Sequence, residues 1–269
     1  MPDDRANDSG RHDSTGRSRS LTIDNGRGER LAARLDLPSA DEPVAVVLLA
    51  HCFTCSKDLR GLRHVARALT DAGFAVLRLD FTGLGASEGE FEHTTFSTNV
   101  ADVLAALDSL EREMPLPCVL VGHSLGGAAV LAAALQRSEV RAVAAIAAPA
   151  DPAHLTSLLD GGLEAIERDG HATIDIGGRA FTVRRELIDD LRASALPAAL
   201  GRLQRPLLIL HSPSDVTVRI GQAADLFAAA LHPKSFVALD GADHLLSESR
   251  DASYAGAVIA VWARRHVTG

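Results

Sequence analysis

The chain has 269 residues, of which 46% are hydrophobic and 23% are charged, and its formal net charge is −8 at pH 7. This acidic balance argues against binding to nucleic acid or to anionic membranes, which attract basic surfaces. The apolar runs fall short of the roughly 20 residues that a membrane span requires. We therefore expect one main soluble domain with a large buried core.

Residues 1–20 are polar and charged, and they contain no apolar segment that could act as a signal peptide or an anchor. This composition predicts a disordered tail. The chain has three cysteines. Because no paired framework and no export signal accompany them, they favour a reducing, cytoplasmic location.

Two short strand patterns separated by Asn25-Gly26 predict an antiparallel hairpin directly after the tail. Apolar runs then alternate with helical patterns along most of the chain. The expected strands contain, in order, the segments VAVVLLAH, FAVLRLDF, PCVLVG, VRAVAAIAA, PLLILHS and KSFVALD. This alternation is typical of βαβ units and predicts an α/β fold with a mostly parallel, doubly wound sheet.

The alternation breaks in residues 150–205, where helical patterns flank a second predicted hairpin with a Gly177-Gly178 turn. We interpret this segment as a small lid insert, because long inserts on rigid α/β scaffolds tend to cover the ligand site. An edge extension of the sheet is the alternative. Residues 21–149 and 206–269 then form the core.

The segment GHSLG, residues 122–126, matches G-x-S-x-G between a predicted strand and a predicted helix. In that context it predicts a nucleophile elbow, a turn so sharp that flanking side chains must be absent. Ser124 is the candidate nucleophile. A serine hydroxyl is weak on its own, so it needs a base that is itself oriented by a carboxylate.

Asp215 and His244 each follow an expected strand, in the order serine, acid, histidine that such a fold requires. Asp240 and Asp243 are rival acids, but both lie on the loop that carries the histidine. We therefore predict a catalytic triad of Ser124, His244 and Asp215.

The charge that develops on an attacked carbonyl oxygen must be held by backbone N–H donors. Leu125 directly follows the nucleophile at the start of a predicted helix, so its N–H is the first candidate. The second donor is expected from the loop HCFTCSKD, which follows the first buried strand.

With these motifs the chain resembles the α/β-hydrolase superfamily over nearly everything after the tail. HCFT falls where these enzymes commonly carry His-Gly-Phe, and the resemblance implies that the N–H of Phe53 is the second oxyanion donor. DFTGLGASEG resembles the family's Asp-x-x-Gly-x-Gly-x-Ser loop. Several segments are also similar to a bacterial group often fused to a C-terminal OsmC-like domain, and we expect no such domain in this protein.

Cys52 stands where the related enzymes usually carry glycine, and we expect its side chain to narrow the acyl pocket. With Cys55 it forms C-x-x-C, which is compatible with a redox-active pair or with half of a zinc site that His51 and His93 would have to complete. Packing with a modest effect on substrate choice is the preferred interpretation. His123, inside the elbow, is a second candidate pocket residue.

GLGASEG imitates a dinucleotide fingerprint, but Gly89 comes one position late and no helix follows at once. GHSLGG lacks the lysine of a phosphate-binding loop. We expect no cofactor and no metal.

The expected activity is hydrolysis of a small-molecule carboxylic ester or thioester through an acyl-enzyme. Cofactor-free perhydrolysis on the same residues and a catalytically idle binding module with a redox-active thiol pair are the alternatives. The sequence leaves the natural substrate and the oligomeric state open, a homo-oligomer included.

Overall fold

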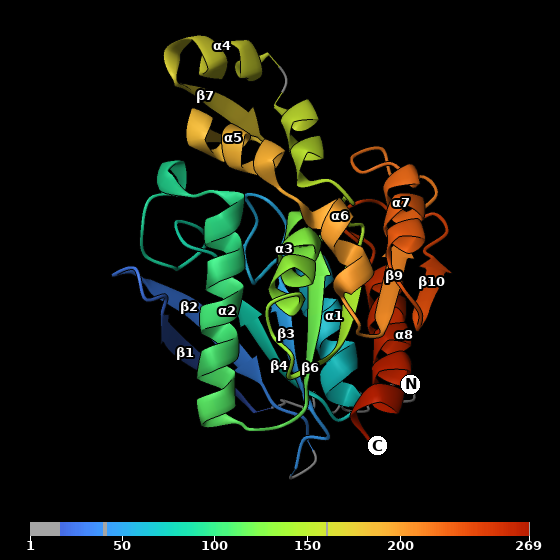
Figure 1. Ribbon diagram of the computed structural model, residues 1–269. Coiled ribbons are helices and arrows are strands. Elements are labelled where there is room, and N and C mark those ends of the chain that lie inside the picture. The colour runs from blue at the N-terminus through green and yellow to red at the C-terminus, as the bar shows by residue number, and fades with distance from the viewer. Residues whose placement is uncertain (1–16, 40–41, 160, 269) are drawn as a thin grey trace, which may run out of the picture.

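The computed structural model describes residues 17–39, 42–159 and 161–268. Its main element is an eight-stranded sheet in the order β1-β2-β4-β3-β5-β6-β9-β10 (Figure 1). The strands are β1 (Ser18–Asp24), β2 (Arg30–Asp36), β3 (Val46–Ala50), β4 (Ala75–Leu79), β5 (Cys118–His123), β6 (Val140–Ile146), β9 (Leu207–His211) and β10 (Lys234–Ala238). The β1–β2 and β2–β4 pairs are antiparallel and the others are parallel, which confirms the predicted architecture.

The central strands are apolar along their whole length because helices cover both faces of the sheet. Every residue of β3, β4 and β5 is buried. Helices α1 (Arg60–Asp71) and α8 (Ser249–Val267) pack on one face. Helices α2 (Phe96–Glu113), α3 (Leu125–Ala134) and α7 (Gly221–Ala229) pack on the other.

The periodicity of α1 shows how sequence selects the buried face. Leu62, Val65, Ala66 and Leu69 recur at helical spacing and are all buried. Its exposed side carries arginines instead. Helix α3 differs, because it is apolar all round and nine of its ten residues are buried. It lies in the middle of the helical layer, directly behind the strand that precedes it.

The insert forms its own small unit above the carboxyl ends of the parallel strands (Figure 1). A separate two-stranded sheet pairs β7 (His171–Ile176) with β8 (Arg179–Arg184) around the predicted glycine turn. The helices are α4 (Gly162–Asp169), α5 (Arg185–Ala193) and α6 (Leu196–Ala199), with short 3-10 turns at η2 (Pro152–Leu158) and η3 (Leu200–Arg202); a third such turn, η1 (Phe91–His93), precedes α2. In the described part of the chain this hairpin does not pair with the main sheet, so the edge extension is wrong.

The boundary of the predicted tail is also wrong by three residues. Residues 18–20 belong to β1, where they pair with residues 34–36 of β2. Pairing with β2 gives the backbone N–H and C=O groups of these residues hydrogen-bond partners. This pairing stabilises a strand although the side chains are polar. Arg17 is also described, and its carbonyl oxygen accepts the N–H of Leu37 at 2.8 Å. Residues 1–16 of the predicted tail lie outside the described residues.

Candidate active site

Strand β5 ends at His123, and Ser124 turns the chain abruptly into α3. Ser124 has φ +54°, a left-handed conformation that is uncommon for residues other than glycine and stores strain at functional sites. A Cβ atom on Gly122 would collide with the backbone of Gly126, and one on Gly126 would collide with the carbonyl oxygen of His51. The glycines of the motif are therefore required by the close approach of helix, strand and neighbouring loop.

The structure brings together the three side chains that the sequence singled out. His244 Nε2 lies 3.0 Å from Ser124 Oγ, and His244 Nδ1 lies 2.8 Å from Asp215 Oδ2. Asp215 follows β9 and His244 follows β10, so both loops leave the same edge of the sheet as the elbow. The rival Asp243 instead accepts hydrogen bonds from the N–H and the hydroxyl of Ser247.

The electrostatics of Asp215 suit a group that orients an imidazole. Burial raises the pKa of its carboxyl group, but hydrogen bonds from His244 and from the N–H groups of Val218 and Thr217 outweigh this effect and hold the pKa below its usual value. The ionised carboxylate accepts the Nδ1–H of His244. That leaves Nε2 as the acceptor for the hydroxyl proton of Ser124.

Two backbone N–H groups next to Ser124 are free to bind an oxyanion. Among the described residues, neither the N–H of Phe53 nor that of Leu125 donates a hydrogen bond to another protein group. Leu125 is the first residue of α3, where the helix leaves its N–H unsatisfied. These are the two donors that the sequence and the family resemblance indicated.

His51 fixes the loop that carries Phe53. Its Nδ1–H donates to the carbonyl oxygen of Cys52 at 2.7 Å, and its Nε2 accepts the N–H of Phe81 at 3.3 Å. Complete burial lowers the pKa of His51, which keeps this bridging imidazole neutral. Both ring nitrogens of His51 are thus occupied by hydrogen bonds to the backbone. This agrees with a structural role for His51 and not with the role of zinc ligand considered in the sequence analysis.

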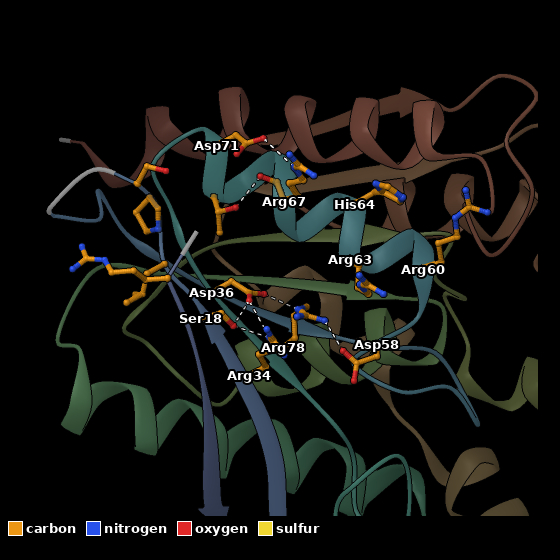
Figure 2. A pocket seen from close by; sticks show the side chains of 15 residues that line it. Ser18, Arg34, Asp36, Asp58, Arg60, Arg63, His64, Arg67, Asp71 and Arg78 are labelled. Atoms are coloured by element: carbon orange, nitrogen blue, oxygen red, sulfur yellow. Dashed lines mark hydrogen bonds and ion pairs between the residues drawn. The ribbon is translucent and has the colours of Figure 1, made fainter. Parts of the chain in front are cut away.

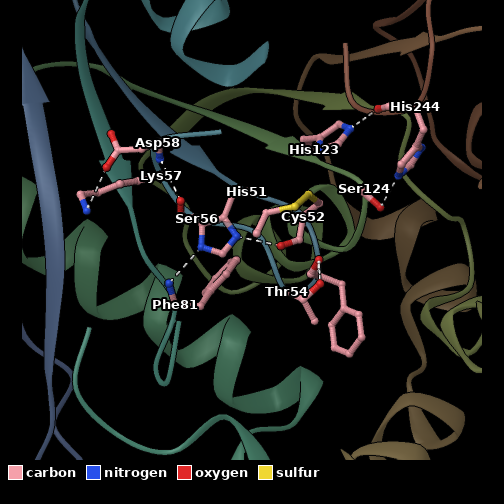
Figure 3. The surroundings of a disulfide bond; sticks show 12 residues. His51, Cys52, Thr54, Ser56, Lys57, Asp58, Phe81, His123, Ser124 and His244 are labelled. Carbon is pink, nitrogen blue, oxygen red and sulfur yellow. Dashed lines mark hydrogen bonds and ion pairs between the residues drawn. A yellow bond between two sulfur atoms is a disulfide. The ribbon is translucent and has the colours of Figure 1, made fainter. Parts of the chain in front are cut away.

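Cys52 and Cys55 form a disulfide, shown in Figure 3. The sequence interpretation, which found no paired cysteines and preferred plain packing, is wrong on this point. A sulfur bonded to its partner is also not a thiolate ligand, so in this state the pair does not supply half of a zinc site. Among the described residues no group of three or more potential ligands comes together to hold a metal ion.

A cavity of about 520 Å³ opens onto Ser124 and His244. Its lining includes leucine and isoleucine side chains of the insert, both cysteines of the disulfide and Phe53. Arg179 of β8 also lines this cavity, and its guanidinium donates to the carbonyl oxygen of Thr54 at 3.3 Å. No sequence signal pointed to Arg179, because it reaches the cavity only through the folding of a distant hairpin.

His123 is not a pocket residue, which corrects the sequence prediction. Its side chain is fully buried and does not line the cavity. It donates from Nε2 to the carbonyl oxygen of His244 at 2.6 Å, and burial lowers its pKa to about 3 (Figure 3). His123 therefore supports the loop that carries His244 from behind, as a neutral imidazole.

A second groove, of about 730 Å³, runs along α1 and is lined mainly by charged side chains (Figure 2). Arg60, Arg63 and Arg67 project from the helix. On the opposite wall Arg78 bonds Asp36 at 2.7 Å. This groove contains none of the three side chains that meet at the elbow, so the candidate active site is the apolar cavity.

Comparison with known proteins shows the superfamily of the chain. The esterase domain of a Rhodothermus marinus protein is 50% identical and has a TM-score of 0.78, over 93% of this chain and 99% of that one. The chain belongs to the α/β-hydrolase superfamily. A family model described as serine aminopeptidase, S33, matches residues 41–166 of this superfamily member.

More distant relatives match the chain only in part. Human ABHD10, a mitochondrial palmitoyl-protein thioesterase, is 41% identical over 80 residues, which is 29% of this chain and 25% of the relative. A Rickettsia prowazekii protein of unknown role is 30% identical over 132 residues, 48% of this chain and 54% of the relative. The aligned part thus spans from a quarter to about half of these relatives. In the described residues we find no helix with the length and apolarity of a bilayer span.

Proposed function

We propose that the protein is a serine hydrolase that cleaves carboxylic esters or thioesters through an acyl-enzyme. The observation that carries this proposal is the continuous relay from Ser124 Oγ through His244 to Asp215, with contacts of 3.0 Å and 2.8 Å. The esterase relative and, over a shorter segment, the thioesterase relative support the same class of bond.

In the acylation step, Ser124 Oγ attacks the carbonyl carbon while His244 Nε2 accepts the hydroxyl proton. The negative charge on the carbonyl oxygen is held by the N–H groups of Phe53 and Leu125, which have no other protein acceptor among the described residues. His244 then passes the proton to the departing alkoxide or thiolate, so that the leaving group departs as an alcohol or thiol and the acyl group stays on Ser124.

Deacylation repeats these steps with water as the nucleophile. His244 removes a proton from the water molecule, the hydroxide attacks the acyl carbon, and Ser124 recovers its proton as the carboxylic acid leaves. Asp215 stays ionised throughout and stabilises the imidazolium that forms twice per cycle.

We also propose a cytoplasmic location for this hydrolase, as expected from the sequence.

The apolar wall of the cavity favours an acyl group of hydrocarbon character. Leu155, Leu158, Leu159 and Ile176 all come from the insert and face the cavity that contains Ser124. Burial of each methylene against such a wall contributes about 0.8 kcal/mol. We therefore propose that the insert acts as the lid predicted from the sequence and sets the length of acyl chain that is accepted.

The proposal is tested by labelling with a fluorophosphonate and by turnover of nitrophenyl esters and simple thioesters of increasing chain length. The wild-type protein should gain the label on Ser124, and Ser124→Ala should lose both the label and roughly 10⁶-fold of the rate. Ser157→Ala, at an exposed serine of the insert, is the matched control and should behave as the wild type. Labelling that persists in Ser124→Ala would contradict the assignment.

A further inference from the structure

The Cys52–Cys55 disulfide closes a small covalent ring around the backbone that we assign to the oxyanion hole. The two cysteines flank Phe53 and Thr54, and both line the cavity that contains Ser124 and His244 (Figure 3). Cys52 is buried, whereas Cys55 is partly exposed. The bond therefore has one face toward the space that substrates enter.

The backbone inside this ring is held in an unfavourable conformation. Thr54 has φ +60°, which for a β-branched residue is a strained, left-handed conformation. Such strain persists only where the surroundings over-determine it. The constraints include the disulfide, a hydrogen bond from the N–H of Cys55 to the carbonyl oxygen of Cys52 at 3.3 Å, and the bond from Arg179 to Thr54 at 3.3 Å. His51 Nδ1 and the Thr54 hydroxyl add shorter bonds, each of 2.7 Å, to the carbonyl oxygens of Cys52 and Phe53.

The N–H of Phe53 depends on these constraints for its direction. It makes no hydrogen bond of its own to the protein within the described residues, but its peptide unit also carries the carbonyl oxygen of Cys52, which accepts from His51 at 2.7 Å and from the N–H of Cys55 at 3.3 Å. Its orientation follows from the conformation of the loop on both sides. The disulfide is the covalent constraint among those that hold the loop, and the two hydrogen bonds at 3.3 Å lie at the long end of the usual range.

We propose that Cys52–Cys55 is a thiol–disulfide exchange site for small dithiols, and that its reduction disables the oxyanion hole. A thiolate of the dithiol attacks Sγ of Cys55, the more exposed of the two residues, and forms a mixed disulfide while Cys52 leaves as a thiolate. The second thiolate of the reductant then attacks its own bonded sulfur and releases Cys55 as a thiolate. Both cysteines take up a proton, two electrons pass to the protein, and the reductant leaves as a cyclic disulfide.

Loss of the disulfide lets Thr54 relax toward an ordinary backbone conformation. This change turns the N–H of Phe53 away from the carbonyl oxygen of the substrate. An oxyanion donor acts mainly in the transition state, so its loss lowers kcat and leaves KM nearly unchanged. Removal of one such donor typically lowers kcat by about 10²–10³-fold. A loop that samples the correct orientation part of the time loses less, and we expect a fall of at least about tenfold.

The test uses the full chain, oxidised or reduced with dithiothreitol, and follows kcat, KM and the number of free thiols together. The chain has three cysteines, and Cys118 is buried and free, so unfolding in denaturant should reveal one thiol in the oxidised protein and three in the reduced protein. The rate effect rests on the proposed hydrolase activity. We expect kcat to fall with reduction, KM to hold, and kcat to recover when an oxidised dithiol restores the bond.

Variants separate this effect from a general effect of reductant. Cys52→Ser with Cys55→Ser should show the low kcat of the reduced protein under all conditions, with no further response to dithiothreitol. Cys118→Ala, at a buried cysteine far from the loop, should keep the full response. If the double variant folds poorly, the reversible response of the wild type decides the matter.

Two results would overturn the proposal. One is a protein with three titrated thiols and an unchanged kcat. The other is a folded protein whose disulfide resists excess dithiothreitol, because an exchange site must be reachable. If Ser124 of the oxidised protein takes no fluorophosphonate, the proposed hydrolase activity fails by itself. The exchange site is then tested separately with glutathione. We expect a mixed disulfide between glutathione and Cys55, and a protein in which neither cysteine forms one would contradict the exchange site.

Discussion

The first turn of α1 meets the loop of His244 at Gly61, where a methyl group has no room. A Cβ atom built on Gly61 lies 2.8 Å from the carbonyl oxygen of Leu246 and closer still to that of Leu245, whereas ordinary contact begins at 3.4 Å. The loop must therefore retreat by at least about 0.6 Å in Gly61→Ala. Leu245 directly follows His244, so the displacement reaches the imidazole.

We expect this change to lower both kcat and the free energy of unfolding. A misplacement of about 1 Å in a catalytic group can lower the rate by about 10²-fold, so a retreat of this size predicts a fall in kcat of roughly 10- to 100-fold. Overpacking predicts a loss of about 1–3 kcal/mol in the free energy of unfolding. The assays are nitrophenyl ester kinetics and urea denaturation.

Gly221→Ala is the matched control, because Gly221 also lies in the first turn of a helix but a Cβ there meets nothing within 4 Å. It should leave kcat unchanged and be neutral or slightly stabilising, since alanine favours helix over glycine by up to about 1 kcal/mol. If Gly61→Ala is folded and its kcat stays within twofold of the wild type, the loop is not held by this contact and our reasoning is wrong.

Four further substitutions probe the same region. Asp215→Asn should lower kcat by about 10⁴-fold by favouring the wrong tautomer of His244, while Asp243→Asn should leave kcat within a few-fold; equal effects would point to the wrong acid. The pKa of His123 is about 3 in the folded protein, where it is buried, and about 6.5 in the unfolded chain. Between these values the unfolded chain binds the proton more tightly, so the contribution of His123 to the free energy of unfolding is complete above pH 6.5 and is lost as the pH falls toward 3, at up to about 1.4 kcal/mol per pH unit. Urea denaturation across this range should show a flatter pH dependence in His123→Gln, which keeps a donor for the carbonyl oxygen of His244. Gly126→Ala should yield little folded protein on expression, because its Cβ would collide with the backbone of the loop that carries Phe53.

The arrangement at the elbow could be predicted because three simple rules converge on it. Ser124, Asp215 and His244 each follow an apolar run that is long enough for a buried strand. Parallel strands end at the same edge of a sheet, so residues that follow them lie close together. The order of the three residues and the glycines around the serine then select one constellation.

Other features of the site depend on geometry that polarity patterns do not encode. The C-x-x-C spacing is compatible with free thiols, metal ligands or a disulfide, and no local signal predicts the left-handed Thr54 that lies between the two bonded cysteines. His123 closes a buried strand, and its orientation toward the carbonyl oxygen of His244 is set by a loop 121 residues away. Arg179 enters the cavity through the folding of the insert.

The core and the insert contribute different parts of the candidate site, and this affects how the substrate preference of the protein can change. The relay side chains and both backbone donors belong to the core, while a large part of the cavity wall comes from η2 and the β7–β8 hairpin. Substitutions at the leucine and isoleucine positions of the insert can reshape the proposed acyl space, while Arg179 of the same hairpin also contacts the loop that carries Phe53. For the proposed hydrolase, new substrate ranges are therefore accessible through single substitutions in the insert that leave Ser124, His244 and Asp215 in place, and exchange of residues 152–184 between relatives is the natural way to transfer a preference.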